Sequence, residues 1–162
     1  MYPRQEFLFL INALESYHRI DFEDRYMDDG NYNDKVYCNL VEAIPEDIPN
    51  SLKDSLKSRL KYHNEYSLKK RLDEILERFK STIDVIIEEK DNFSNRVKDM
   101  RNYYSHYFEI GEEITFEELN NKKEKLKTIV EICILGEIDD DLLKDKDLIE
   151  KLDKSKMKFE TL

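Results

Sequence analysis

Apolar residues recur every three to four positions along most of this chain, the spacing that places them on one face of an α-helix. In the first such stretch, Phe7, Leu10 and Leu14 share a face. The predicted helices cover residues 4–20, 35–43, 51–64, 68–89, 95–108, 116–135 and 139–153. No segment keeps the period of two that a half-buried strand requires. The pattern therefore predicts an all-α fold, a bundle of about five to six helices.

Polar and glycine-containing segments predict where these helices begin and end. Residues 28–34, rich in Asp, Asn and Gly, have the composition of a turn, and residues 91–94 are expected to interrupt the helical pattern. Thr115 and Glu118 have the spacing of a capping box. Gly136 is expected to end the helix that this box begins.

The length of 162 residues suits one domain. We expect a single domain over 1–162, with a core bundle over 4–135 and a C-terminal helix and polar tail over 139–162. Gly and Pro number only 3 each, which excludes collagen-like and Pro/Gly-rich chains. No apolar run approaches the roughly 20 residues that span a membrane. We therefore expect a soluble, cytoplasmic protein whose Cys38 and Cys133 are reduced, mostly buried thiols.

The charge balance excludes a general nucleic-acid coat. Asp and Glu number 37 against 27 Lys and Arg, for a net charge of −10, so long-range attraction to phosphate is absent. Only residues 51–80 are basic. Their candidate RNA contacts are Lys53, Lys57, Arg59, Lys61, Lys69, Lys70 and Arg71. The alternative is that these cations form the solvated faces of amphipathic helices.

The chain has three histidines, His18, His63 and His106. We expect His18, three residues after Glu15, to form a surface hydrogen bond, and His63 to lie at a frayed helix end. The sequence has no zinc-protease motif, no Walker loop and no dinucleotide or nucleophile-elbow motif. It therefore predicts neither a metal site nor a cofactor.

His106 ends the motif Arg101-Asn102-Tyr103-Tyr104-Ser105-His106. On a helix, Asn102 and His106 are i, i+4 neighbours on one face, while Arg101 lies about 140° around from His106. An imidazole can move a proton to or from a ribose hydroxyl, and a guanidinium can clamp a phosphate. These are parts of a metal-independent ribonuclease. The alternative is a surface ion pair at Arg101 and a helix hydrogen bond at His106.

This motif, late in an all-α chain, resembles the Arg-x4-6-His signature of the HEPN superfamily. The first helix, with Leu14-Glu15-Ser16-Tyr17-His18-Arg19, resembles the ApeA-like bacterial branch. So does the stretch from Leu60-Lys61-Tyr62-His63-Asn64-Glu65 through Ser67-Leu68-Lys69-Lys70-Arg71-Leu72. The resemblance covers roughly residues 7–135.

The resemblance implies a HEPN-like helical bundle that dimerises and places two motifs beside a shared cleft. Many members are metal-independent RNases of toxin–antitoxin, CRISPR or anti-phage systems that leave a cyclic phosphate. Arg101, Asn102 and His106 fall on the motif positions. Because ApeA-like proteins are usually longer, this chain is expected to be a standalone version or an excised part, with a further domain or regulatory partner. Some HEPN toxins carry a modified Tyr two residues after the His, where this chain has Phe108 instead.

The sequence thus predicts a homodimeric endoribonuclease that cleaves RNA, with tRNA as one candidate substrate, in anti-phage defence or as a toxin. His106 would be the general base or acid, Arg101 the phosphate clamp and Asn102 the orienting group, with Arg96 and Lys98 as substrate contacts. One alternative is a non-catalytic dimeric module that binds protein or nucleotide. Another is an acidic antitoxin or immunity partner that mimics nucleic acid.

The tyrosines around the motif also leave two interpretations open. Tyr103, Tyr104 and Tyr107 are candidates for base stacking. At helical spacing such tyrosines more often belong to the core. Tyr103 and Tyr107, four positions apart, share one side of the helix, and Tyr104 shares another with Met100 and Phe108, so at least one of these two sets must face inward.

Overall fold

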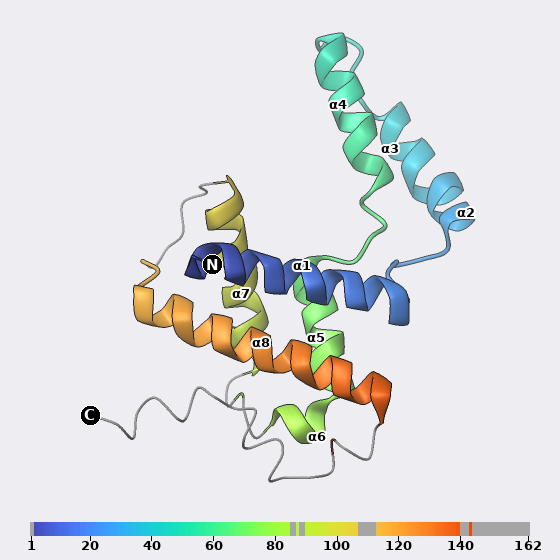
Figure 1. The fold of residues 1–162 in the computed structure, drawn as a ribbon. Coiled ribbons are helices and arrows are strands. Elements are labelled where there is room, and N and C mark those ends of the chain that lie inside the picture. Colours follow the sequence, from blue (N-terminus) through green and yellow to red (C-terminus); the bar gives the residue numbers. More distant parts are fainter. Residues whose placement is uncertain (1, 85–86, 88–89, 107–112, 140–142, 144–162) are drawn as a thin grey trace. The chain divides into compact units, whose positions relative to one another are not determined.

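The computed structural model describes residues 2–84, 87, 90–106, 113–139 and 143. Across these ranges the chain is all-α, as the sequence predicted, and its only β pairing is an isolated bridge between Arg25 and Glu65. The helices are α1 (Pro3–Asp21), α2 (Asp29–Tyr32), α3 (Cys38–Glu42), α4 (Asn50–Lys61), α5 (Leu68–Arg78), α6 (Lys80–Ile83), α7 (Lys90–His106) and α8 (Phe116–Ile138) (Figure 1). A π-helical turn, η1 (Asn33–Tyr37), joins α2 to α3. The segment predicted as a helix over 139–153 lies almost entirely outside the described residues.

The chain divides into two compact units. One combines Met1–Asp21 with Leu68–Leu162, and the other is Phe22–Ser67. Both units are built from helices of the same periodicity, and the single domain expected over 1–162 stays a prediction. None of the described helices is long and apolar enough to cross a membrane.

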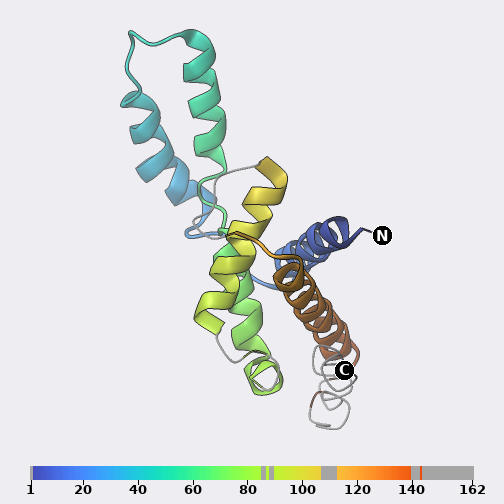
Figure 2. The same cartoon turned by 90° about the vertical axis from the view of Figure 1, so that its left-hand side faces the viewer.

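The larger unit holds the hydrophobic core. Its helix α1 lies side by side with α8, and α5 lies side by side with α7 (Figures 1 and 2). Each helix contributes apolar side chains at helical spacing. The fully buried ones include Phe7, Ile11, Leu14, Leu72, Ile75, Phe93, Val97, Met100, Leu126, Ile129 and Ile132. This burial, rather than helix propensity, is what stabilises the packed helices.

The helix predicted over 68–89 is broken at Phe79, and α8 runs beyond its predicted end. Phe79 has φ −102° and ψ 26°, which separates α5 from α6. Its ring packs against α8, where a Cβ on Gly136 would lie 2.8 Å from Phe79 Cε1. Gly136 therefore allows a close approach inside the helix, and the prediction that it ends the helix is wrong.

The interruption predicted at residues 91–94 is also wrong. Helix α7 passes through these positions without a break, and Phe93 and Ser94 are fully buried. Their polar neighbours resemble a turn in composition, but the apolar period of α7 begins at Phe93 and continues through Val97 and Met100.

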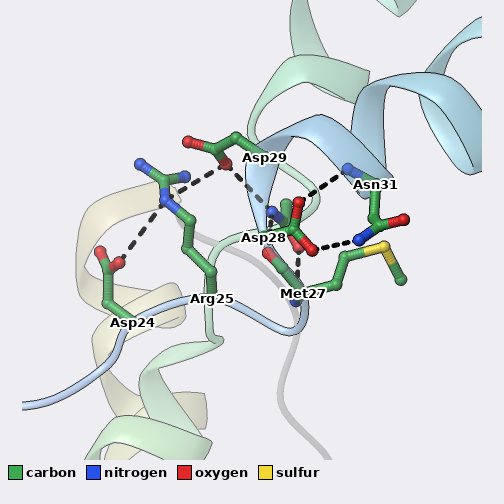
Figure 3. Close-up of polar contacts among 7 residues, drawn as sticks. Asp24, Arg25, Met27, Asp28, Asp29 and Asn31 are labelled. Atoms are coloured by element: carbon green, nitrogen blue, oxygen red, sulfur yellow. Dashed lines mark hydrogen bonds and ion pairs between the residues drawn. The ribbon is translucent and has the colours of Figure 1, made fainter.

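The smaller unit is a helical hairpin in which α2, η1 and α3 run alongside α4 (Figures 1 and 2). The turn predicted over 28–34 is a helix start instead. Asp28 is the N-cap of α2, and its Oδ1 accepts the backbone N–H of Asn31 at 2.9 Å (Figure 3). The same Asp-rich composition serves turns and helix caps, which explains the error.

A second set of contacts closes the base of this hairpin. Buried Asn64 accepts the N–H of Met27 at 3.1 Å and donates to the carbonyl of Met27 at 2.8 Å. Nearby, Arg25 lies between Asp24 and Asp29, with Nε–Oδ1 distances of 3.7 and 3.4 Å (Figure 3). In residues 22–67 only Tyr32 and Asn64 are buried, so polar contacts carry much of the hairpin's organisation.

His18 is buried rather than on the surface. Its side chain is 0% exposed, and its Nε2 lies 2.8 Å from Glu74 Oε2 on α5. Burial raises the pKa of Glu74, but hydrogen bonds from Lys70 and His18 outweigh it and leave that pKa below its ordinary value. The predicted surface hydrogen bond to Glu15 is therefore replaced by a pairing between helices.

The two cysteines are free thiols, as predicted, but only one is buried. Cys38 is exposed. Burial raises the pKa of Cys133 to about 12, which keeps this thiol protonated and inert at neutral pH.

Candidate active site

Helix α7 carries the whole Arg-to-His motif and is anchored by its apolar face. Phe93, Val97 and Met100 are buried, and this fixes which side of the helix faces outward. Arg101 is half-buried, and His106 is exposed as the last residue of α7. Tyr107 and Phe108, which follow the motif, lie outside the described residues.

Arg101 and Asn102 are in direct contact. Nη1 of Arg101 donates to Oδ1 of Asn102 at 3.2 Å, and both side chains are half-buried. Asn102 and His106 stand four positions apart on the same helix, so they share a face. The arrangement thus orients the guanidinium through Asn102 and presents the imidazole at the helix end.

Arg4, which sequence reasoning did not single out, holds the last turn of α7. Its Nη2 donates to the backbone carbonyl of Tyr104 at 2.5 Å, and its guanidinium lies 5.2 Å from the centre of the Tyr104 ring. The last carbonyls of a helix have no partner within the helix, so this contact ties down the turn that carries His106. Nothing in the sequence spacing marks Arg4, because its partner lies a hundred residues away.

Tyr103 and Tyr104 are both half-buried, and their rings contact other aromatic rings. Tyr104 meets buried Phe7 edge-on, with ring centres 5.9 Å apart, and Tyr103 meets Tyr104 at 5.2 Å. Burial, followed by the nearby Tyr103, raises the pKa of Tyr104 above its ordinary value. Tyr104 therefore belongs to the inward set that it forms with Met100, and it stays a neutral phenol.

The two predicted substrate contacts differ in their surroundings. Nε and Nη2 of Arg96 form a bidentate pair with Glu118 Oε1 and Oε2, at 2.5 and 2.6 Å. This pairing is the main cause that lowers the pKa of Glu118. Lys98 is half-exposed, and its Nζ lies 3.0 Å from Oδ1 of the adjacent Asp99. Arg96 thus has a strong partner within the chain, whereas the pair that Lys98 forms with Asp99 is a surface one.

Glu118 also explains how the predicted capping box is built. Thr115 Oγ1 accepts the N–H of Glu118 at 3.1 Å, which confirms the N-cap of α8. The Glu118 carboxylate binds Arg96, so the start of α8 is fastened to the helix that carries the motif.

No three His, Cys, Asp or Glu side chains among the described residues come together in a group that could hold a metal ion. At the end of α7 the motif brings together the imidazole of His106, the guanidinium of Arg101 and the amide of Asn102.

A family model described as Apea-like HEPN matches residues 8–141, a range that includes the whole motif. Neither the curated proteins nor the solved structures gave a significant match.

Proposed function

The chain belongs to the Apea-like HEPN family, and from that premise we propose that it is a metal-independent endoribonuclease. The observation that carries the proposal is the end of α7. There Arg101 is oriented by Asn102, and exposed His106 lies on the same face as Asn102. We place the activity in anti-phage defence or in a toxin, the settings that the HEPN resemblance implies.

The proposed reaction is attack of a ribose 2′-hydroxyl on the adjacent phosphodiester. His106 Nε2 or Nδ1 takes the 2′ proton, and the 2′ oxygen forms a bond to phosphorus. The bond from phosphorus to the 5′ oxygen breaks, and the leaving oxygen takes up a proton from water. The products are a 2′,3′-cyclic phosphate and a 5′-hydroxyl. Arg101 faces the non-bridging oxygens and stabilises the charge that grows on them.

Arg101 provides the first test. We expect Arg101→Ala to lower kcat for cleavage of total RNA or tRNA in EDTA by about 10²–10³-fold, as loss of one charge-stabilising donor does elsewhere. Arg101→Lys should recover only part of the rate, because an ammonium cannot make the bidentate contact of a guanidinium. Cleavage by Arg101→Ala at the wild-type rate would contradict the assigned role.

The proposed active form is a homodimer in which Arg101 of one copy and His106 of the other serve one site. On a single helix the two residues point about 140° apart, and a composite site removes this difficulty.

Mixing two inactive variants tests this arrangement. We expect Arg101→Ala and His106→Ala separately to keep at most about 1% of wild-type cleavage, and to recover a substantial part of it after they are co-refolded, because mixed dimers restore one complete site. The matched control is Arg101→Ala mixed with the double variant Arg101→Ala/His106→Ala, which should recover nothing. Mixed dimers that form but stay inactive would contradict the shared site, since Arg101 and His106 of each active site would then come from the same copy of the chain.

A further inference from the structure

Tyr104 is a residue through which the motif helix rests on α1. Its ring meets that of buried Phe7 edge-on at 5.9 Å, and its backbone carbonyl accepts a hydrogen bond from Nη2 of Arg4 at 2.5 Å. Arg4 and Phe7 stand three positions apart on α1, so they lie on the same face of that helix. One face of α1 therefore holds both the side chain and the main chain of Tyr104.

Tyr104 lies between the two charged groups of the motif. It comes three residues after Arg101 and two residues before His106, the last residue of α7. The last four carbonyls of a helix have no partner within the helix, and helix ends fray. A donor from outside the helix keeps this turn formed, and so it limits the positions that the exposed imidazole of His106 can take.

Arg4 stands on a helix that is itself well anchored. Phe7 and Ile11 of α1 are fully buried in the core. In the first turn of α1, Glu6 Oε2 lies 3.5 Å from Nζ of Lys123 on α8, a lysine that is only 12% exposed. A donor on a rigid element fixes the position of its acceptor. The contact from Arg4 therefore holds the end of α7 in place.

The other explanation is that Arg4 serves stability alone, as a cation near the C-terminus of a helix does. Four candidate RNA contacts of the basic segment do serve the fold, because three of them contact carboxylates and the fourth is only 1% exposed: Lys53, Lys69, Lys70 and Arg71. Arg4 differs from them because its acceptor is a main-chain carbonyl two residues before His106. Its contact thus acts on the orientation of a proposed catalytic group, and the two explanations predict different values of kcat.

We propose that Arg4 is a positioning residue for RNA cleavage, which keeps the last turn of α7 formed and His106 in place by holding the Tyr104 carbonyl. Arg4 acts through the main chain of α7 and needs no contact with RNA. The effect on cleavage rests on the proposed ribonuclease function. The effect on the last turn of α7 rests on the contact between Arg4 and Tyr104 alone.

Arg4→Met and Arg4→Lys test the role in cleavage, because both keep a long side chain and only the lysine keeps a donor and a charge. With tRNA in EDTA, we expect Arg4→Met to lower kcat by about 10–100-fold, the cost of a misplaced catalytic group, and to leave KM within about twofold. Arg4→Lys should recover part of kcat, since an ammonium can donate to one carbonyl. The matched control is Arg19→Ala, which removes an exposed arginine from the same helix and should change neither constant.

Amide hydrogen exchange, followed by NMR, tests the contact without cleavage. In Arg4→Met the amides of Ser105 and His106 should exchange at least about tenfold faster than in the wild type, because a hydrogen bond from a charged donor contributes about that factor. The amides of Val97 and Met100 should keep their wild-type rates, since opening confined to the last turn does not reach the core. In Arg4→Lys the exchange rates should lie between those of Arg4→Met and the wild type.

Three results would overturn the inference. A folded Arg4→Met that cleaves with the wild-type kcat would leave the ribonuclease standing without a role for Arg4. A raised KM at unchanged kcat would make Arg4 a substrate contact instead. Equal acceleration of exchange in the last turn and in the core would make its role purely structural.

A second variant and the exchange measurement keep the test decisive. If circular dichroism shows that Arg4→Met has lost helicity, both measurements are repeated on Arg4→Gln, whose shorter side chain ends in a neutral amide and should also lower kcat. Wild-type protein that cleaves no RNA contradicts the proposed function. The exchange rates of Ser105 and His106 still decide in that case whether Arg4 holds the last turn of α7.

Discussion

Replacement of His106 by Ala is expected to lower kcat for RNA cleavage by about 10²–10⁴-fold, the usual contribution of a positioned general acid or base. We expect the substitution to slow the chemical step without unfolding the protein, because His106 is exposed and is the last residue of α7. Removing its ring opens no cavity in the core formed by Phe93, Val97 and Met100. Helicity and oligomeric state should therefore match those of the wild type.

His63 supplies the matched control for this experiment. It is also an exposed histidine near a helix C-terminus, where its Nδ1 lies 2.9 Å from the carbonyl of Arg59. His63→Ala should leave kcat at saturating RNA unchanged. Full activity in His106→Ala would refute the role of His106, and failure of folded wild-type dimers to cleave any RNA would favour the non-catalytic interaction module.

Replacement of Phe7 by Ala is expected to destabilise the protein by about 3–5 kcal/mol, the usual range for a buried Phe. Phe7 is 0% exposed on α1, and its ring meets Tyr104 edge-on at 5.9 Å. The substitution removes core packing and the support beneath the motif helix together. Because small domains are stable by only about 5–15 kcal/mol, much of the total stability would be lost. Urea unfolding followed by circular dichroism measures the change.

Phe9 lies two residues away on the same helix but is 62% exposed, so Phe9→Ala makes a matched comparison. It should change stability by no more than about 0.5 kcal/mol. Similar losses in both variants would contradict the packing described here for α1.

The sequence predicted the long helices well because their apolar residues repeat strictly. The first helix was expected over 4–20 and is found at Pro3–Asp21, and the N-cap at Thr115 is where the spacing placed it. The predictions were wrong where the same residue types occur both in turns and in helices. Asp28 begins a helix although its neighbours have turn composition, and Gly136 lies within a helix because Phe79 packs against it.

The motif was the part of the candidate site that sequence could supply, since its residues are close together in the chain. The structure adds partners that are distant in sequence and therefore carry no local signal. Arg4 holds the carbonyl of Tyr104, and Arg96 is paired with Glu118. The burial of His18 was missed for the same reason, because Glu74 lies on another helix.

The central claim is that the Arg101, Asn102 and His106 motif cleaves RNA without a metal ion. The most direct test is to incubate wild-type and His106→Ala protein with total RNA and tRNA in EDTA and to map the fragment ends. Fragments that end in 2′,3′-cyclic phosphate and begin with 5′-hydroxyl, made by the wild type and lost in His106→Ala, are the predicted result. Fragments with 3′-hydroxyl and 5′-phosphate ends, or cleavage that persists in His106→Ala, would contradict it.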